Sequence, residues 1–466
     1  MELFGTAGVR GDVTDRVTPE LAVRVGRAAG DEAAAAGAVA PTFVVGRDGR
    51  TSGPGLAAAV EAGLESAGAE VVRLGVLPTP ALAFASRGRR GVMLTASHNP
   101  PTDNGLKLFV DGVEYDRDRE RAVERRVDAG VAPVEWDRWG ASREESPLSR
   151  YRDATVEYAR GHGAPLDGLR VVVDCGNGVG SLATPAVLDR LGATVVAVNA
   201  NVDGHFPGRE SKPTAESLGD LSRLLAADDA GLGFAHDGDA DRVVVAGGDG
   251  ELVHEDTVLA VLAAHYVERS DVADPVAVTT PNASGRVDER VAAADGRVER
   301  VRLGALHEGV ASARAAGGDV VFAAEPWKHV HPAFGGWIDG VTTAAVFARL
   351  VAAATPEGGD AADGLAALRA PVTERPYRKG DVACPDDAKA AAMARVEARL
   401  PDAFPAAEVD LEHGVRLSFP DASWLLVRPS GTEPYLRVYA ESDDVDALLA
   451  TATEVCEAAV ADAREA

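Results

Sequence analysis

One serine stands in a loop whose composition suits a covalent carrier of a phosphoryl group. Residues 95–101 read TASHNPP and follow an apolar run at residues 91–95 that predicts a buried strand. Two prolines stiffen the loop, and the first disfavours helical conformation in the residue before it. A rigid loop that presents Ser97 suits nucleophilic catalysis, and Lys107, in the NGLK sequence that follows, could act as a general acid or base or hold a phosphate. A turn with a capping serine and a surface lysine is the alternative.

A second stretch places three carboxylates at alternate positions. Asp237, Asp239 and Asp241 are separated only by Gly and Ala, so their side chains can converge on one hard cation if the loop curls. Mg²⁺ prefers such oxygen ligands, whereas an EF-hand for calcium needs Gly at its sixth position and an acidic residue at its twelfth. Here those positions hold Arg242 and Gly248, so the calcium interpretation is rejected. The alternative is a solvated acidic turn. The neighbouring Arg242 favours the metal site instead, because it would pair with a phosphate that bridges to the metal.

A third polar loop offers the parts of a phosphate-binding site. Residues 428–434 (RPSGTEP) follow a predicted strand and combine an arginine, two hydroxyls and a backbone freed by glycine, and Arg437 lies a few residues further on. Residues 4–11 (FGTAGVRG) and 46–52 (GRDGRTS) also set arginines among glycines and are weaker candidates for contact with a phosphate. An ordinary turn between strands is the alternative for the third loop.

Other catalytic patterns fail at defined residues. No lysine follows a glycine, which excludes a Walker A loop, and residues 176–181 (GNGVGS) lack the third glycine of the dinucleotide fingerprint. We interpret that run as a tight turn between a strand and a helix. The HEGVA sequence fails the zinc-protease pattern at Ala311. Neither Cys175 nor Cys384 has an arginine six residues later, as a cysteine phosphatase would.

The charge of the chain restricts its partners. The 466 residues carry a net charge of −26, from 73 acidic and 47 basic residues. Such a field repels nucleic acid and anionic membranes, so neither is expected as a partner. Only five of the basic residues are lysines. An acidic surface with few lysines predicts a halophilic protein in a salt-rich cytoplasm, where screening weakens self-repulsion. A genome biased towards Arg and Ala codons is the alternative.

The sequence predicts a cytoplasmic protein. Its N-terminus lacks the basic and apolar regions of a secretory signal, and no window approaches the roughly 18 uninterrupted apolar residues of a membrane span. The three cysteines form no CxxC pair, which fits a reduced cytosol and packing roles for all three.

The elements that must position these loops are typical of α/β domains. Strand-like runs alternate with helices through most of the chain, which predicts doubly wound sheets, and an α+β pattern follows from about residue 370. Residues 131–150 are expected to form a linker or a domain edge, and residues 355–364 a flexible boundary. We predict four domains over residues 1–150, 151–254, 255–366 and 367–466.

Four motifs in this order and spacing resemble the α-D-phosphohexomutase family: FGTAGVRG, TASHNP with NGLK, DGDADR and RPSGTEPYLRVY. The family includes phosphoglucomutase, phosphomannomutase and phosphoglucosamine mutase, and this chain looks closest to archaeal members. The resemblance covers essentially the whole chain. It implies three related α/β domains and a smaller C-terminal α+β domain around a central cleft. It also implies phosphoryl transfer between C1 and C6 of a glucose, mannose or glucosamine phosphate through a phosphoserine and a bisphosphate intermediate.

The resemblance further implies roles for individual residues. Asp237, Asp239 and Asp241 would hold one Mg²⁺ per chain together with the phosphate on Ser97, and a hexose 1,6-bisphosphate would be the activator. Lys107 would shuttle the proton. The candidate catalytic residues are Ser97, Lys107, Arg10 and His98. The candidate substrate-binding residues are Arg242, Glu325, Trp327, Lys328, His329, Arg428, Ser430, Gly431, Thr432 and Arg437.

One stretch departs from the family pattern. Where the family has Glu-x-Ser-Gly-His or Glu-x-x-Gly-Gly, this chain has EPWKH, so Trp327 and Lys328 replace a small pair between Glu325 and His329. Trp327 could stack on the sugar, Lys328 could bind a hydroxyl or a phosphate, or the loop could select another substrate. Phosphopentomutase, a sugar-phosphate-binding regulator without turnover and a phosphatase-like hydrolase are the alternatives for the whole chain. We expect a monomer or homodimer whose partner is a small sugar phosphate.

Overall fold

The computed structural model describes residues 3–5, 8–37, 40–227, 230–430 and 433–464. The chain divides into two compact units, one formed by Met1–Val258 with Phe322–Arg369 and the other by Leu259–Val321 with Ala370–Ala466. Each unit therefore combines segments that are distant in the sequence.

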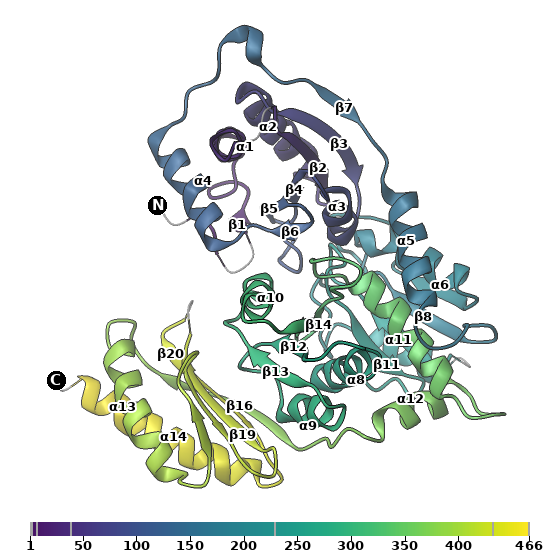
Figure 1. Cartoon of the computed structure of the whole chain (residues 1–466), viewed down its shortest axis with the longest axis vertical. Helices are drawn as coiled ribbons and strands as arrows, with labels where there is room; N and C mark the ends of the chain where they lie inside the picture. The colour runs from purple at the N-terminus through teal and green to yellow at the C-terminus, as the bar shows by residue number, and fades with distance from the viewer. Residues whose placement is uncertain (1–2, 6–7, 38–39, 228–229, 431–432, 465–466) are drawn as a thin grey trace. The chain divides into compact units, whose positions relative to one another are not determined.

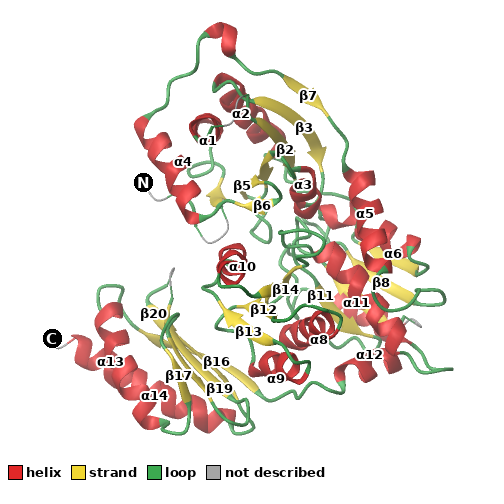
Figure 2. Cartoon of the chain, in the orientation of Figure 1, coloured by secondary structure: helices red, strands yellow, loops and turns green. Residues whose placement is uncertain are grey.

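The first unit opens with a seven-stranded mixed sheet of order β1-β5-β4-β2-β3-β7, in which β6 pairs with β5 (Figures 1 and 2). Strand β2 is parallel to both of its neighbours, whereas β5 is antiparallel to β1 and β4. The strands are β1 (Val9–Asp12), β2 (Thr42–Arg47), β3 (Glu70–Val76), β4 (Arg90–Leu94), β5 (Asp103–Val110), β6 (Val113–Glu114) and β7 (Ser142–Glu144).

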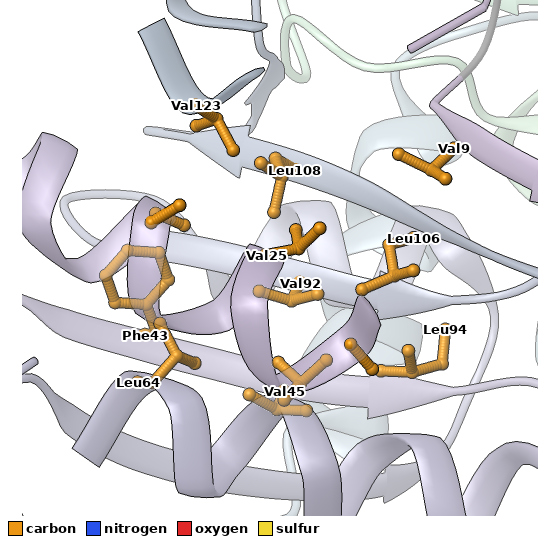
Figure 3. Close-up of a cluster of buried hydrophobic side chains, with 14 of the residues drawn as sticks. Val9, Val25, Phe43, Val45, Leu64, Val92, Leu94, Leu106, Leu108 and Val123 are labelled. Carbon is orange, nitrogen blue, oxygen red and sulfur yellow. The ribbon is translucent and has the colours of Figure 1, made fainter. Parts of the chain in front are cut away.

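Helices α1 and α2, which pack on this sheet, approach each other closely because each has a glycine at their contact. A Cβ on Gly26 would lie 2.4 Å from the carbonyl oxygen of Val60, and one on Gly63 would lie 2.3 Å from that of Val23. The hydrophobic core that these helices cover is drawn in Figure 3, where Val25, Phe43 and Leu64 are among the labelled side chains. The helices are α1 (Pro19–Ala35), α2 (Gly53–Ser66), α3 (Thr79–Ala85) and α4 (Arg117–Ala129).

The segment 131–150, expected to be a linker or a domain edge, contributes to the first sheet. It contains the short helix η1 (Trp136–Arg138) and strand β7, which pairs in parallel with β3. Helix α5 (Leu148–Arg160) then begins within the same segment. The sequence did not predict β7, because an edge strand of three residues needs no apolar run and the segment is mixed and charged.

The second sheet of this unit has the order β11-β10-β8-β9. Strand β10 is parallel to β8 and antiparallel to β11, and the acidic loop that begins at Asp237 follows it in the chain. The strands are β8 (Arg170–Asp174), β9 (Thr194–Val198), β10 (Leu232–Ala235) and β11 (Val244–Gly247). The neighbouring helices are η2 (Val179–Leu182), α6 (Thr184–Arg190), α7 (Gly219–Ala227), α11 (Gly340–Ala354) and α12 (Ala361–Arg369). Because α12 begins at Ala361, the irregular part of the expected flexible boundary is shorter than predicted.

A third mixed sheet has the order β13-β12-β14-β15. Strands β12 and β13 are parallel and β14 and β15 antiparallel, and the chain passes from the second unit to the first within β14. The strands are β12 (Pro275–Thr279), β13 (Arg297–Arg300), β14 (Asp319–Glu325) and β15 (Lys328–Val330). The helices of this part are α8 (Glu255–Glu268), α9 (Gly285–Ala293) and α10 (Leu306–Ala315).

The C-terminal part is an antiparallel sheet of order β16-β20-β19-β18-β17, and helices α13 and α14 cover one of its faces (Figure 1). The elements are β16 (Tyr377–Ala383), α13 (Lys389–Ala403), β17 (Glu408–Asp410), β18 (Val415–Ser418), β19 (Trp424–Pro429), β20 (Tyr435–Glu441) and α14 (Val445–Arg464). Three mixed α/β sheets and a C-terminal antiparallel sheet confirm the predicted fold class. Among the described residues, no helix has both the length and the apolarity that a bilayer span requires.

Candidate active site

Ser97 is buried just beyond the end of β4 and meets the acidic loop directly. Its hydroxyl donates a hydrogen bond of 2.6 Å to Oδ2 of Asp237, and His98 Nδ1 lies 3.3 Å from the same Oγ. The backbone of Ser97 has a φ of +51°, a left-handed conformation that costs a non-glycine residue of order 1–3 kcal/mol. Surrounding contacts must therefore hold this conformation in place.

The three predicted metal ligands lie together. Asp237, Asp239 and Asp241 are buried, and ligand oxygens of the three carboxylates lie within 4.8 Å of one another. Ala240, between the last two, has a φ of +59°, which curls the loop so that carboxylates at alternate positions converge. Oδ1 of Asp239 and Oδ1 of Asp241 are buried without a hydrogen-bond partner. Such oxygens are costly unless a cation or a donor satisfies them, so this donor set fits a hard divalent ion such as Mg²⁺.

The charges of the cluster oppose one another. Burial, with the charges of Asp241 and Asp239, raises the pKa of Asp237 to about 8. Burial also acts to raise the pKa of Asp241, but the cations Lys107, Lys328 and Arg242 outweigh it and hold that pKa well below its usual range. Asp237 and Asp241 therefore do not both ionise readily without additional positive charge at the cluster.

Lys107 on β5 lies at the same cluster. Its Nζ is 2.6 Å from Oδ2 of Asp241 and 3.2 Å from Oδ2 of Asp239, and its side chain is only 2% exposed. Burial acts to lower the pKa of Lys107, but these two carboxylates raise it above its usual value. Lys107 pairs in register with Met93 of β4, so neighbouring strands carry the lysine and the serine loop.

Three further candidates, a neutral histidine and two arginines, lie near Ser97 and the acidic loop. Burial lowers the pKa of His98 to about 2, with help from the charges of Arg242 and Arg10, so its imidazole is neutral. Arg10 lies on β1 opposite Gly105 of β5, and Arg242 Nε is 3.7 Å from Oδ2 of Asp237. The Nε atoms of Arg10 and Arg242 are buried without a hydrogen-bond acceptor. Buried, unsatisfied guanidinium donors suit the oxygens of a phosphate.

The predicted sugar loop forms the tight turn between β14 and β15 in the same unit. Lys328 Nζ lies 3.5 Å from Oε2 of Glu325, and the backbone of Lys328 bridges to that of Arg242 in the acidic loop. Trp327 has a φ of +68°, and its carbonyl accepts a hydrogen bond of 3.1 Å from the amide of Val243. The turn therefore lies directly beside the metal loop.

Trp327 in this turn and His329 on β15 have surroundings that the sequence did not reveal. Trp327 packs against the hydrophobic core of the second sheet, which includes Leu221 and Val244. Its contact with a sugar stays a prediction. His329 is buried beside Phe322, with ring centroids 5.9 Å apart, and neither of its ring nitrogens has a hydrogen-bond partner. Burial lowers the pKa of His329 to about 3.

The predicted phosphate loop belongs to the second unit. Arg428 on β19 is paired in register with Arg437 on β20, and Arg428 Nη2 donates to the hydroxyl of Tyr439 at 2.9 Å. Lys389 Nζ donates to the carbonyl oxygen of Ser430 at 2.6 Å. Arg437 is in turn paired with two carboxylates, at 3.4 Å from Asp381 and 3.2 Å from Glu433. Gly431 and Thr432, also predicted here, lie outside the described residues.

The sequence missed one group that contacts the site, Thr79, and gave no sign of what Arg50 contacts. Thr79, at the start of α3, donates a hydrogen bond of 2.6 Å to Oδ2 of Asp239, and nothing in its local sequence signals this contact. Arg50 is buried behind the serine loop rather than facing it as a free cation. The glycine-rich stretch around Arg50 had suggested contact with a phosphate, but the hydrogen-bond partners of the Arg50 guanidinium are all protein atoms.

Comparisons with known proteins agree with this geometry. The chain matches family descriptions for phosphoglucomutase/phosphomannomutase domain I over residues 1–132, domain II over residues 150–250 and the C-terminal domain over residues 381–458. A phosphopentomutase of Thermococcus kodakarensis is 41% identical over 450 residues, which cover 95% of this chain and 94% of that protein. A probable phosphoglucosamine mutase of Methanopyrus kandleri is 41% identical over 448 residues, or 94% of each chain.

A solved structure is similar over nearly its whole length. The crystal structure of a phosphoglucomutase/phosphomannomutase family protein from Burkholderia thailandensis has a TM-score of 0.84 and 27% identity to this chain. The match covers 99% of this chain and 97% of that one.

Proposed function

This chain belongs to the phosphoglucomutase/phosphomannomutase family, and on that premise we propose that it moves a phosphoryl group between two hydroxyls of one sugar phosphate, with Ser97 as the carrier. The observation that carries the proposal is the hydrogen bond of 2.6 Å from Ser97 Oγ to Asp237, within a cluster of three buried carboxylates. A regulator that only bound sugar phosphates would need neither a nucleophile at this cluster nor a buried lysine beside it.

Asp237, Asp239 and Asp241 would hold Mg²⁺. When bound, that ion supplies positive charge that offsets the carboxylates and stabilises charge on a phosphoryl group leaving Ser97. Arg10 and Arg242 contribute guanidinium donors for the oxygens of the same group, because their buried Nε atoms have no other acceptor. His98 is neutral, so it adds a hydrogen-bonding group at Ser97 Oγ without adding charge.

Transfer in each half-reaction exchanges one P–O bond for another. In the first half, a sugar hydroxyl attacks phosphorus, the bond from phosphorus to Ser97 Oγ breaks, and the product is a sugar bisphosphate. In the second half, Ser97 Oγ attacks the other phosphate and the sugar oxygen leaves. We assign the proton shuttle to Lys107: despite its burial, the neighbouring carboxylates raise its pKa, so Nζ carries a proton at the start of each half-reaction. Nζ gives this proton to the leaving oxygen, and the neutral amine that results accepts the proton of the attacking hydroxyl. The position of Nζ against Asp239 and Asp241 holds it at the site of transfer.

We propose a hexose phosphate as substrate, with transfer between C1 and C6 of a glucose, mannose or glucosamine phosphate and a hexose 1,6-bisphosphate as activator. Pentose phosphate is the second candidate, because a relative named phosphopentomutase is 41% identical over 95% of this chain. Glu325, Trp327, Lys328 and His329 are our candidates for reading the sugar. Arg428, Ser430, Gly431, Thr432 and Arg437 are our candidates for binding the phosphate that does not react.

A ³¹P NMR time course tests the proposal. The purified chain would be incubated in concentrated KCl with Mg²⁺ and a trace of hexose 1,6-bisphosphate. The 1-phosphates of glucose, mannose, glucosamine and ribose would be offered separately, each beside Ser97→Ala. Appearance of the distal phosphate ester, lost in the variant, supports a mutase and ranks its sugars. Free inorganic phosphate without an isomer indicates a hydrolase, and no reaction with any sugar favours a binding protein.

A further inference from the structure

Arg50 has every donor of its guanidinium occupied by the protein. Nη2 donates to the carbonyl oxygens of Ser97, at 2.9 Å, and Asn99, at 2.7 Å. Nη1 donates to those of Pro100, at 2.5 Å, and Asp103, at 2.8 Å. One planar cation therefore binds four backbone carbonyls of the loop that carries the proposed nucleophile.

The fifth donor binds a carboxylate that also reaches the loop. Arg50 Nε donates to Oδ2 of Asp48 at 3.0 Å, and neither side chain is exposed. The same Asp48 oxygen accepts a hydrogen bond of 2.7 Å from the hydroxyl of Thr95, which in turn accepts the amide of Ser97 at 2.8 Å. The Asp48–Arg50 pair thus holds Ser97 from both its amide and its carbonyl side.

These hydrogen bonds offset two unfavourable features of the serine loop. Ser97 adopts a left-handed φ of +51°, and four carbonyl dipoles converge in a buried space. A guanidinium presents five donors in a fixed plane, so it can satisfy these acceptors together without rearrangement. The ring of Phe206 lies 5.2 Å from the guanidinium carbon and limits its movement.

We propose that Arg50, held by Asp48, is a positioning residue that fixes the Ser97 backbone for phosphoryl transfer. Because its five N–H groups are all used by protein acceptors, Arg50 has none left to bind a substrate phosphate. It acts on the reaction through the loop and not through the sugar. The inference rests on the proposed mutase function.

Arg50→Lys tests the proposal, because an ammonium preserves the charge beside Asp48 but cannot span four carbonyls. Arg286→Lys is the matched control, since Arg286 is 1% exposed, pairs with buried Glu441 and lies in the other unit. We expect Arg50→Lys to lower kcat roughly 100-fold, the cost of displacing reacting groups by about 1 Å, while KM changes less than about threefold. Arg286→Lys should leave kcat near that of the wild type.

Hydrogen exchange of the amides in residues 97–103 supplies a readout independent of activity. Faster exchange there in Arg50→Lys, but not in Arg286→Lys, supports the proposal. A folded Arg50→Lys with wild-type kcat overturns it, whatever its melting temperature.

If near-UV circular dichroism shows that Arg50→Lys is unfolded, Thr95→Val replaces it, because this change removes the hydrogen bonds of the Thr95 hydroxyl with little change of shape. An unchanged kcat in Thr95→Val would then overturn the proposal. If the wild type isomerises no sugar phosphate, the proposed function fails by itself. Hydrogen exchange alone then tests whether Arg50 positions the serine loop. Unchanged exchange of the loop amides in the variants overturns that role.

Discussion

Ser97 and Asp237 are 140 positions apart in the sequence, yet the serine hydroxyl donates a hydrogen bond of 2.6 Å to the aspartate. This contact joins the loop after β4 of the first sheet to the loop after β10 of the second. Both loops leave the carboxyl ends of strands that lie within their sheets, where open α/β sheets commonly place ligand sites. The candidate nucleophile and the candidate metal ligands are therefore held by two separately built sheets of one unit.

Mg²⁺ should stabilise the folded chain through the three-carboxylate cluster. We expect the melting temperature to rise with Mg²⁺, since an ion at 100 times its Kd adds about 2.7 kcal/mol to the free energy of unfolding. Asp239→Asn should lose most of this increase, because Asp239 offers an oxygen without any other partner. Asp256→Asn, which changes a buried carboxylate outside the cluster, is the control. An equal Mg²⁺ response in both variants would place the ion elsewhere.

Lys328 should influence which sugar the chain accepts. Its ammonium lies 3.5 Å from Glu325 and beside the acidic loop, so it compensates a carboxylate that could otherwise attract a cationic sugar. We expect Lys328→Ala to raise kcat/KM for glucosamine 1-phosphate relative to glucose 1-phosphate by about tenfold, or about 1.4 kcal/mol. The measurement is a competition between the two sugars. Lys212→Ala removes an exposed lysine as control, and an unchanged ratio in Lys328→Ala would rule out this role.

His329 should make the fold sensitive to acid. Burial lowers its pKa to about 3, whereas an unfolded histidine titrates near 6.5. Between these values the unfolded chain binds more protons than the folded chain, so stability from His329 is complete above about pH 6.5 and falls as the pH decreases. The loss is at most about 1.4 kcal/mol per pH unit. His329→Phe, which keeps an aromatic ring beside Phe322, should show a shallower decrease in the free energy of urea unfolding from pH 6.5 to 4. Parallel curves for the two proteins would refute this account.

The contact between α1 and α2 should not tolerate a methyl group. Gly26→Ala would place Cβ 2.4 Å from the carbonyl oxygen of Val60, so we expect a loss of about 1–3 kcal/mol in the free energy of unfolding. Gly55→Ala is the control, because a Cβ there meets nothing within 4 Å and alanine favours a helix. Urea unfolding of both variants measures the difference. Equal stabilities would show that the helices can separate at no cost.

The sequence alone was sufficient for features that depend on neighbouring residues. Alternating strands and helices predicted the α/β class, and the spacing of Asp237, Asp239 and Asp241 predicted that their carboxylates would converge. Small residues between them allow the loop to curl, as the left-handed Ala240 shows. These are local properties, since backbone conformation and side-chain spacing within one loop depend little on distant parts of the chain.

Only the tertiary structure decided which distant groups meet. Arg50 had appeared as a weak candidate for phosphate contact, but folding places it under four carbonyls of the Ser97 loop. Trp327 packs on the core of the second sheet, a contact that its local sequence did not reveal, and its contact with a sugar stays a prediction. Strand β7 pairs with the edge of the first sheet despite its charged sequence. The physical reason is common to all three. A hydrogen-bond donor, an aromatic ring or a strand edge contacts the groups that the fold places within a few ångströms of it. The local sequence does not determine which groups those are.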